Sequence, residues 1–178
     1  MKKLILIFCG ILFASAGNAQ DIYIQSGKLV DTKSGKVLNE KTIIVSGKKI
    51  KSIEDGFVSP KNPEDSLIDL RNMTVLPGLT DMHVHLESET NPSKYMERFT
   101  NDPADDAFNS VGFANSTLLA GFTTVRDLGG SGVNIALRDA INKGKITGPR
   151  IFTSGKSLAT TGGHADPSNG MNSALTGD

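Results

Sequence analysis

The chain has 178 residues, of which 38% are hydrophobic and 21% are charged, with 19 basic and 19 acidic side chains. This balance is typical of a globular protein and argues against a disordered tail or a coiled coil. The zero formal charge argues against a nucleic-acid partner, which would favour a basic surface. The single cysteine excludes an intramolecular disulfide framework.

The first nineteen residues have the three-part layout of a secretory signal peptide. A basic start precedes an apolar run over residues 4–13, and small residues follow, with Gly17 and Ala19 at the positions of a cleavage site. The apolar run is about half of the ~20 residues that a membrane-spanning helix needs, so no stable membrane anchor is expected. We therefore predict a signal peptide over residues 1–19 and export to the periplasm or the extracellular space.

Residues 20–76 predict a small N-terminal β module. Short β-branched runs alternate with pairs in which glycine follows serine or aspartate, a pattern typical of tight turns because glycine adopts positive φ without strain. The predicted turns are Ser26-Gly27, Ser34-Gly35, Ser46-Gly47 and Asp55-Gly56. About 55 residues are too few to bury a large core alone.

After residue 76 the pattern changes to strands that alternate with helices. Such alternation is typical of right-handed βαβ units and a parallel sheet. Strands are predicted over 79–86, 122–125 and 150–154, and helices over 103–120 and 134–143, each helix ending before a glycine. The apolar residues near one face of the first helix are Ala104, Phe108, Val111 and Leu118.

Residues 77–178 therefore hold three βα units, fewer than a closed barrel requires. An eight-unit (β/α)₈ barrel takes about 250 residues. A three-stranded parallel sheet would also leave an open edge and uncovered apolar faces. We expect an α/β fold in which a small β module precedes the first units of a TIM barrel, truncated at residue 178.

The segment around His83 and His85 is the strongest sign of chemistry in the sequence. Alternate residues of a strand share a face, and residues two apart lie about 7 Å apart at the backbone, so both imidazoles can converge on one ion. The alternative is a pair of polar histidines near a strand end, since neutral histidine is also a common surface residue. The polar face carries Leu79, Asp81, His83 and His85, and the apolar face, expected to pack under helices, carries Thr80, Met82, Val84 and Leu86.

Four motifs in this order resemble the metal-dependent amidohydrolase superfamily, in its imidazolonepropionase-like and Xaa-Pro dipeptidase (prolidase-type) branch. The resemblance covers nearly all of residues 21–178. The motifs are Leu76-Pro-Gly-Leu-Thr-Asp-Met-His-Val-His, Leu119-Ala-Gly-Phe-Thr-Thr-Val-Arg-Asp-Leu-Gly129, Gly148-Pro-Arg-Ile-Phe and Thr161-Gly-Gly-His164.

The resemblance implies a fold, a cofactor and a reaction. In the family, the N-terminal strands join residues from the far C-terminus in a β-sandwich, and a distorted (β/α)₈ barrel holds one or two divalent ions, usually zinc. A metal-activated water hydrolyses a carbon–nitrogen bond. His83 and His85 match the ligands from the first barrel strand. The family's remaining ligands come from the fourth to eighth strands, so this chain alone is expected to bind zinc weakly and to be inactive.

Four residues near the same predicted end of the sheet are further candidates. His164 follows two glycines in the loop after the third strand, where it is a substrate contact or a solvated loop residue. Arg126 and Asp127 end the second strand and could grip a substrate carboxylate or steady a ligand histidine. The alternative is an ion pair between these two side chains. Asp81 is a candidate for orienting His83, or a buried group bonded to backbone.

The other acidic residues and the glycine-rich loop are predicted to have no role in the chemistry. Glu87, Glu89 and the acids of residues 102–106 are expected on solvated surfaces, those at the helix start being favoured by its dipole. Residues 129–132 lack the spacing of a phosphate-binding loop and are expected to form a flexible turn.

The sequence thus predicts an exported metal-dependent amidohydrolase that acts on a small amide, lactam or dipeptide. An Xaa-Pro-type dipeptidase is one alternative, and a non-catalytic half-barrel or pseudoenzyme is another. A periplasmic metal-binding module is the third, although three histidines and no cysteine outside the predicted signal peptide are few for it.

Overall fold

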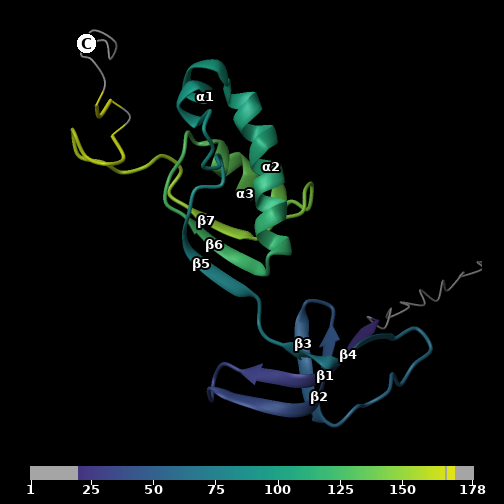
Figure 1. Ribbon diagram of the computed structural model, residues 1–178. Helices are drawn as coiled ribbons and strands as arrows, with labels where there is room; N and C mark the ends of the chain where they lie inside the picture. The colour runs from purple at the N-terminus through teal and green to yellow at the C-terminus, as the bar shows by residue number, and fades with distance from the viewer. Residues whose placement is uncertain (1–19, 167, 171–178) are drawn as a thin grey trace, which may run out of the picture. The chain divides into compact units, whose positions relative to one another are not determined.

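The computed structural model describes residues 20–166 and 168–170, so the predicted signal peptide lies outside the described residues. The chain divides into two compact units, and the boundary lies between Pro77 and Gly78 (Figure 1). Among the described residues, no helix combines the length and the apolar character needed to cross a membrane.

The first unit is a four-stranded sheet. Antiparallel pairing joins β3 to β2 and β2 to β1, whereas β4 runs parallel to β1 at the other edge, in the order β3-β2-β1-β4. The strands are β1 (Asp21–Asp31), β2 (Lys36–Ser46), β3 (Lys49–Asp55) and β4 (Ser66–Val75).

One predicted turn in this unit is wrong. Ser26 and Gly27 lie inside β1, which continues to Asp31 because it is paired on both sides, and the register with β4 shifts between Ser26 and Lys28. A Cβ at Gly27 would lie 2.1 Å from the carbonyl oxygen of Arg71, so the glycine allows β4 to approach rather than reversing the chain. The predicted turns at Gly35 and Gly47 are confirmed, each with positive φ between antiparallel strands, whereas Gly56, also at positive φ, bends the chain from β3 into a loop rather than into a hairpin.

Apolar and hydrogen-bonded polar side chains together form the interior of the first unit. Tyr23 and Ile44 are buried. The Thr42 hydroxyl, also buried, donates to the carbonyl of Gly56 at 2.7 Å and accepts from the amide of Val58 at 2.9 Å. These bonds tie the end of β3 to β2 and satisfy a polar group that would otherwise destabilise the interior.

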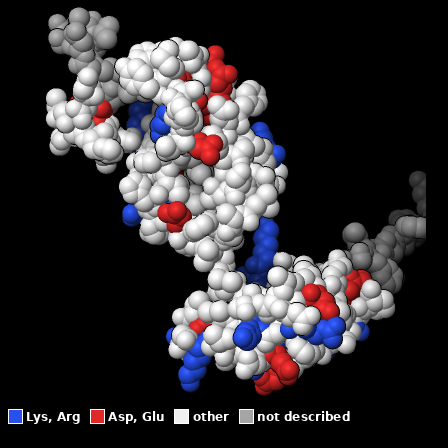
Figure 2. All heavy atoms as spheres, viewed as in Figure 1, with Lys and Arg blue, Asp and Glu red and all other residues white. Residues whose placement is uncertain are grey.

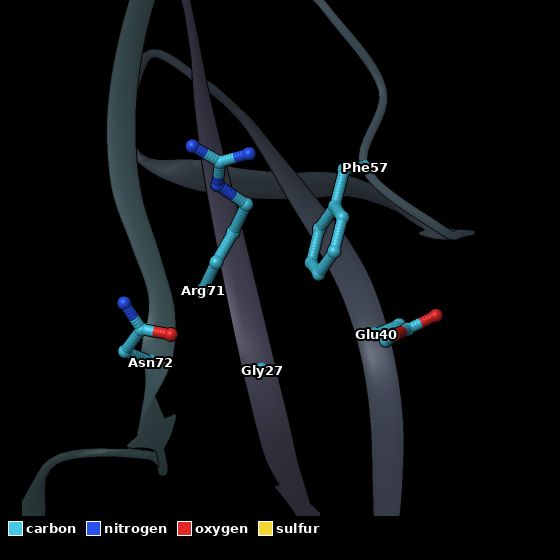
Figure 3. Close-up of a pocket in the computed structure, with 5 residues that line it drawn as sticks. All are labelled: Gly27, Glu40, Phe57, Arg71 and Asn72. Carbon is cyan, nitrogen blue, oxygen red and sulfur yellow. The ribbon is translucent and has the colours of Figure 1, made fainter.

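A small hollow of about 400 Å³ lies beside Gly27 in this unit. The Arg71 guanidinium lies 5.8 Å from the centre of the Phe57 ring (Figure 3). Its Nη2 also donates to Oδ2 of Asp69 at 2.7 Å. Both of these contacts of Arg71 are with residues of the first unit.

The second unit is a three-stranded parallel sheet in the order β5-β6-β7, and α2 and α3 pack against one face of it (Figure 1). The predicted strands and the two predicted helices are confirmed within a few residues, whereas α1 was not predicted. The elements are β5 (Leu79–Val84), α1 (Lys94–Thr100), α2 (Pro103–Leu119), β6 (Phe122–Asp127), α3 (Val133–Asn142) and β7 (Arg150–Thr153).

The start of α2 follows directly from its sequence. The Asp102 carboxylate accepts from the amides of Ala104 and Asp105, and the Asp105 side chain accepts in return from the amide of Asp102. Pro103 occupies the first helical position, where its missing amide hydrogen costs nothing. This capping box confirms the predicted helix start and the expected place of these acids.

The core of the second unit lies between the sheet and its helices. Its buried members are Leu86, Ala114, Val125, Leu137 and Ile151. The predicted inner face of α2 is partly wrong, because Phe108 is 79% exposed and the buried residues of the helix are Ser110 and Ala114. Small side chains there let the helix backbone approach the sheet closely.

Candidate metal site at the ends of the parallel strands

A cleft of about 1140 Å³ lies where the three parallel strands of the second unit end. Its walls include both candidate ligands, the loops that follow β6 and β7, and residues of α1. His164 lines the same cleft and is exposed, whereas no described contact joins it to the other histidines. The lining residues used below are His83, His85, Glu87, Lys94, Gly129 and His164.

His83 and His85 lie close together, as the alternation of a strand predicts. Their ring centres are 5.4 Å apart and the ring planes meet at 70°. His83 belongs to β5 and His85 follows the end of the strand, one position beyond Val84. Both side chains are exposed to the cleft, so their nitrogens are accessible to an ion or a substrate.

A hydrogen bond sets the protonation pattern of His85. Its Nδ1 lies 2.7 Å from the carbonyl oxygen of Gly129. A carbonyl only accepts, so Nδ1 must carry the hydrogen, and in the neutral ring Nε2 then holds a free lone pair. This is the arrangement in which an imidazole binds a metal ion, with its second nitrogen bonded to a backbone carbonyl.

Asp81 contacts His83 through the backbone. Its Oδ1 accepts from the amide of His83 at 2.9 Å, and its side chain is half-buried. The carboxylate therefore steadies the strand at His83, which corresponds to the predicted alternative of a group bonded to backbone.

Arg126 and Asp127 do not act as a pair. The two side chains alternate across β6, so Arg126 is exposed while Asp127 is 1% exposed. The Arg126 Nε donates to the carbonyl of Met82 at 2.7 Å and joins β6 to β5. The predicted ion pair between these neighbours is wrong, because consecutive residues of a strand point to opposite faces.

The buried carboxylate of Asp127 accepts hydrogen bonds from three nitrogens. Its Oδ2 accepts from the amide of Leu86, and its Oδ1 accepts from the amide of Gly129 and from Nδ2 of Asn134, each at 3.0 Å. The Asn134 Nδ2 also donates to the carbonyl of Gly155 at 3.0 Å. These bonds connect the segments that follow β5, β6 and β7.

Glu87 is a functional candidate that the sequence reasoning placed wrongly on a solvated surface. It is half-buried, and its carboxylate accepts from the amide of Ser131 at 2.6 Å and from that of Asn134 at 2.7 Å. These amides lie at the start of α3, where a helix has unpaired N–H groups and a partial positive charge. The loop over 129–132 is therefore held in place rather than being a free turn.

Asn134 was also missed, although the sequence contains a signal for it. It is fully buried and lies at the helical spacing of Leu137 and Ile141, so it is a polar residue on an apolar stripe. Its Oδ1 has no described partner, so the described hydrogen bonds of this side chain are those that Nδ2 donates. A polar residue in such a position predicts a buried hydrogen-bond network.

The donor set suits a transition metal but is only part of a coordination shell. Imidazole nitrogens are ligands of zinc, which is usually bound by four groups. Within residues 20–166 and 168–170, no three His, Cys, Asp or Glu side chains are placed to hold an ion together. His83 and His85 thus fit two positions of such a shell.

Comparison with known proteins finds similarity to one family. Residues 74–176, more than half of the chain, match the model of the Amidohydrolase family. A crystal structure of a Xaa-Pro dipeptidase with methionine bound in the active site is similar, with 48% identity and a TM-score of 0.79, over 87% of this chain and 38% of that one. A prolidase complexed with N-methylphosphonate-L-proline is 33% identical, with a TM-score of 0.69, over 82% of this chain and 34% of that one.

A curated relative extends the comparison. Ochratoxinase from Aspergillus niger is 30% identical over 158 residues, which are 88% of this chain and 32% of the ochratoxinase. The chain therefore spans about a third of the length of the proteins that it matches.

Proposed function

Because the chain belongs to the amidohydrolase family, we propose that the protein hydrolyses a carbon–nitrogen bond in a small amide or peptide. The observation that carries the proposal is the pair His83 and His85 at the ends of parallel strands, with Nε2 of His85 left free by the bond to Gly129. Enzymes built on parallel βα units place their chemistry at this end of the sheet.

We further propose that His83 and His85 hold a divalent metal ion, with zinc as the preferred one. Carboxylates outnumber cations among the described residues of the cleft, and acidic side chains gather where α1 and the start of α2 lie (Figure 2). This surplus of negative charge favours a cation in the cleft. When bound, the ion would supply the Lewis acidity that polarises an amide carbonyl.

The family members among the solved structures favour a peptide substrate with a free carboxylate. Two of them are described as a Xaa-Pro dipeptidase and a prolidase. Lys94 of α1 is the one lysine or arginine among the described residues that line the cleft, so it is a candidate partner for that carboxylate. A lactam without a carboxylate would have no need of this lysine, which separates the two substrate classes.

Lys94→Met tests the substrate class. We expect KM to rise about threefold to fivefold for a dipeptide with a free carboxylate, as for an exposed ion pair worth up to about 1 kcal/mol. The amidated form of the same dipeptide should show no change, because it lacks the charge that Lys94 contacts. Equal effects on both substrates, or none on either, would contradict the assignment.

The metal assignment is tested on the intact protein. His83→Asn and His85→Asn should each lower the bound zinc measured by elemental analysis and abolish hydrolysis of a dipeptide panel. His164→Asn is the matched control among the histidines of this chain, and we expect it to retain zinc while altering KM. Full zinc content in either of the first two variants would refute ligation by that residue.

Export remains our proposal for the location of the protein. Its support is the basic start, the short apolar run and the small residues up to Ala19. N-terminal sequencing of the protein recovered from the periplasm or the medium should begin at Gln20. Recovery of the protein in the cytoplasm with Met1 in place would contradict it.

A further inference from the structure

We propose that Asp127 is a positioning residue that fixes the direction and the tautomer of His85. This inference rests on the proposed metal site, and it adds a role for a buried carboxylate that does not line the cleft. The hydrogen bonds of Asp127 and His85 form a closed ring of contacts. This ring contains His85, which is the proposed metal ligand, and Gly129, whose carbonyl orients the imidazole.

The ring can be followed atom by atom. Asp127 Oδ2 accepts from the backbone N–H of Leu86, and this nitrogen belongs to the peptide bond between His85 and Leu86. The His85 Nδ1 donates to the carbonyl of Gly129 at 2.7 Å, and the amide of Gly129 donates back to Asp127 Oδ1 at 3.0 Å. One carboxylate thus holds both the backbone that carries the imidazole and the residue that binds the imidazole.

Only particular residues can close this ring. A carboxylate accepts with both oxygens, which the amides of Leu86 and Gly129 require. Gly129 has φ +147°, and a Cβ there would lie 2.6 to 2.7 Å from backbone atoms of Ser157, so no larger residue fits without displacement. The direction of the Gly129 carbonyl, and therefore of the His85 ring, follows from this conformation.

Asn134 bonds to Asp127 but forms none of the hydrogen bonds that close the ring between Asp127, Leu86, His85 and Gly129. It donates to Asp127 and to Gly155, but neither the His85 ring nor the peptide bond that follows it is among its described partners. Asn134 therefore contributes to the stability of the network, whereas Asp127 also determines which nitrogen of His85 faces the cleft. This difference supplies a matched comparison between two fully buried residues of the same network.

The experiment measures zinc affinity of the intact protein by competition with a chromophoric chelator. In Asp127→Asn, the new amide group must face either the Leu86 amide or the Gly129 amide, and both are donors, so the ring opens. We expect the Kd for zinc to rise tenfold to 100-fold, as is typical when the group behind a ligand is removed. Asn134→Ala should lower Tm but raise the Kd less than threefold. Asp139→Asn, which removes an exposed carboxylate of α3, should change neither.

A second measurement starts from the wild-type protein. In metal-free protein labelled with ¹⁵N-histidine, two-bond couplings identify the tautomer of each ring, and we expect His85 to carry its hydrogen on Nδ1. In Asp127→Asn the Nε2-protonated form should become populated. A His85 with its hydrogen on Nε2 in the wild-type protein would overturn the inference, even if the variant does not fold.

The possible results separate the two proposals. If the wild-type protein binds no zinc, the proposed metal site fails, and the tautomer still decides the role of Asp127. If zinc binds equally well to the wild type and to Asp127→Asn, the positioning role is refuted while the metal site stands. Equal losses of affinity in Asp127→Asn and Asn134→Ala would also refute it, because a general loss of structure would explain both.

Discussion

The carboxylate of Glu87 should determine how firmly the start of α3 is held. It accepts from the amides of Ser131 and Asn134 at 2.6 and 2.7 Å. In Glu87→Gln the side-chain NH₂ must face one of these donors, so one charge-assisted bond is lost and the other becomes a neutral bond. Such a bond is worth roughly 1.5 kcal/mol and its neutral counterpart about 1 kcal/mol, so we expect local opening to become about 2 kcal/mol easier.

Amide hydrogen exchange measures this opening directly. A loss of about 2 kcal/mol corresponds to exchange about thirtyfold faster at Ser131 and Asn134, since 1.4 kcal/mol is a factor of ten. Glu89→Gln is the matched control, because Glu89 is exposed and lies two positions along the same loop. An increase of less than threefold in Glu87→Gln, or an equal increase in Glu89→Gln, would refute the reasoning.

Two further predictions concern stability in each unit. Leu137 is 4% exposed in the core of the second unit, so Leu137→Ala should lower the free energy of unfolding by about 3 kcal/mol in urea denaturation, whereas Ile135→Ala, at an exposed position of α3, should cost less than about 1 kcal/mol. In the first unit, the hydrogen-bonded Arg71 lowers the pKa of Asp69 from 3.8 to about 2. The stabilising contribution of Asp69 is therefore present above pH 3.8 and is lost as the pH falls through about 2. Asp69→Asn should flatten the dependence of Tm on pH between 4 and 2, and an unchanged slope would contradict the pairing.

The second unit could be predicted from sequence because β6 and β7 each carry a buried apolar residue and the helices are clearly bounded. Val125 and Ile151 belong to short β-branched or apolar runs, and Asp102 with Pro103 forms a local helix start. The helix α1 was not predicted from the sequence because its large side chains do not form an apolar stripe that faces the core. Tyr95 and Phe99 are 64% and 58% exposed.

The errors in the first unit and in α2 have physical reasons as well. A serine followed by glycine suits a tight turn and equally a bulge at which another strand approaches, and only the pairing of β1 with β4 decides between them at Gly27. Phe108 was assigned to the inner face by its hydrophobicity, whereas close packing selects the small residues Ser110 and Ala114.

The candidate ligands could be predicted because the alternation of a strand is local. The groups that support them could be predicted only in part. Asp127 was a candidate for steadying a ligand histidine, whereas Glu87 was not, since its partners lie in a loop distant in sequence. The pattern nevertheless contained one usable sign, the polar Asn134 on the apolar stripe of α3.

The bonds around His85 also impose an order of events while the chain is being made. Leu86, His85 and Glu87 are joined to partners 41, 44 and 47 residues further along the sequence, respectively. When the histidines first leave the ribosome, the partners of His85, Leu86 and Glu87 have not yet been synthesised. The site matures only after β6 and the start of α3 have formed, so an ion captured earlier would meet two mobile imidazoles and dissociate readily. The proposed metal ion would therefore be retained only after the βα units that surround the two histidines have folded.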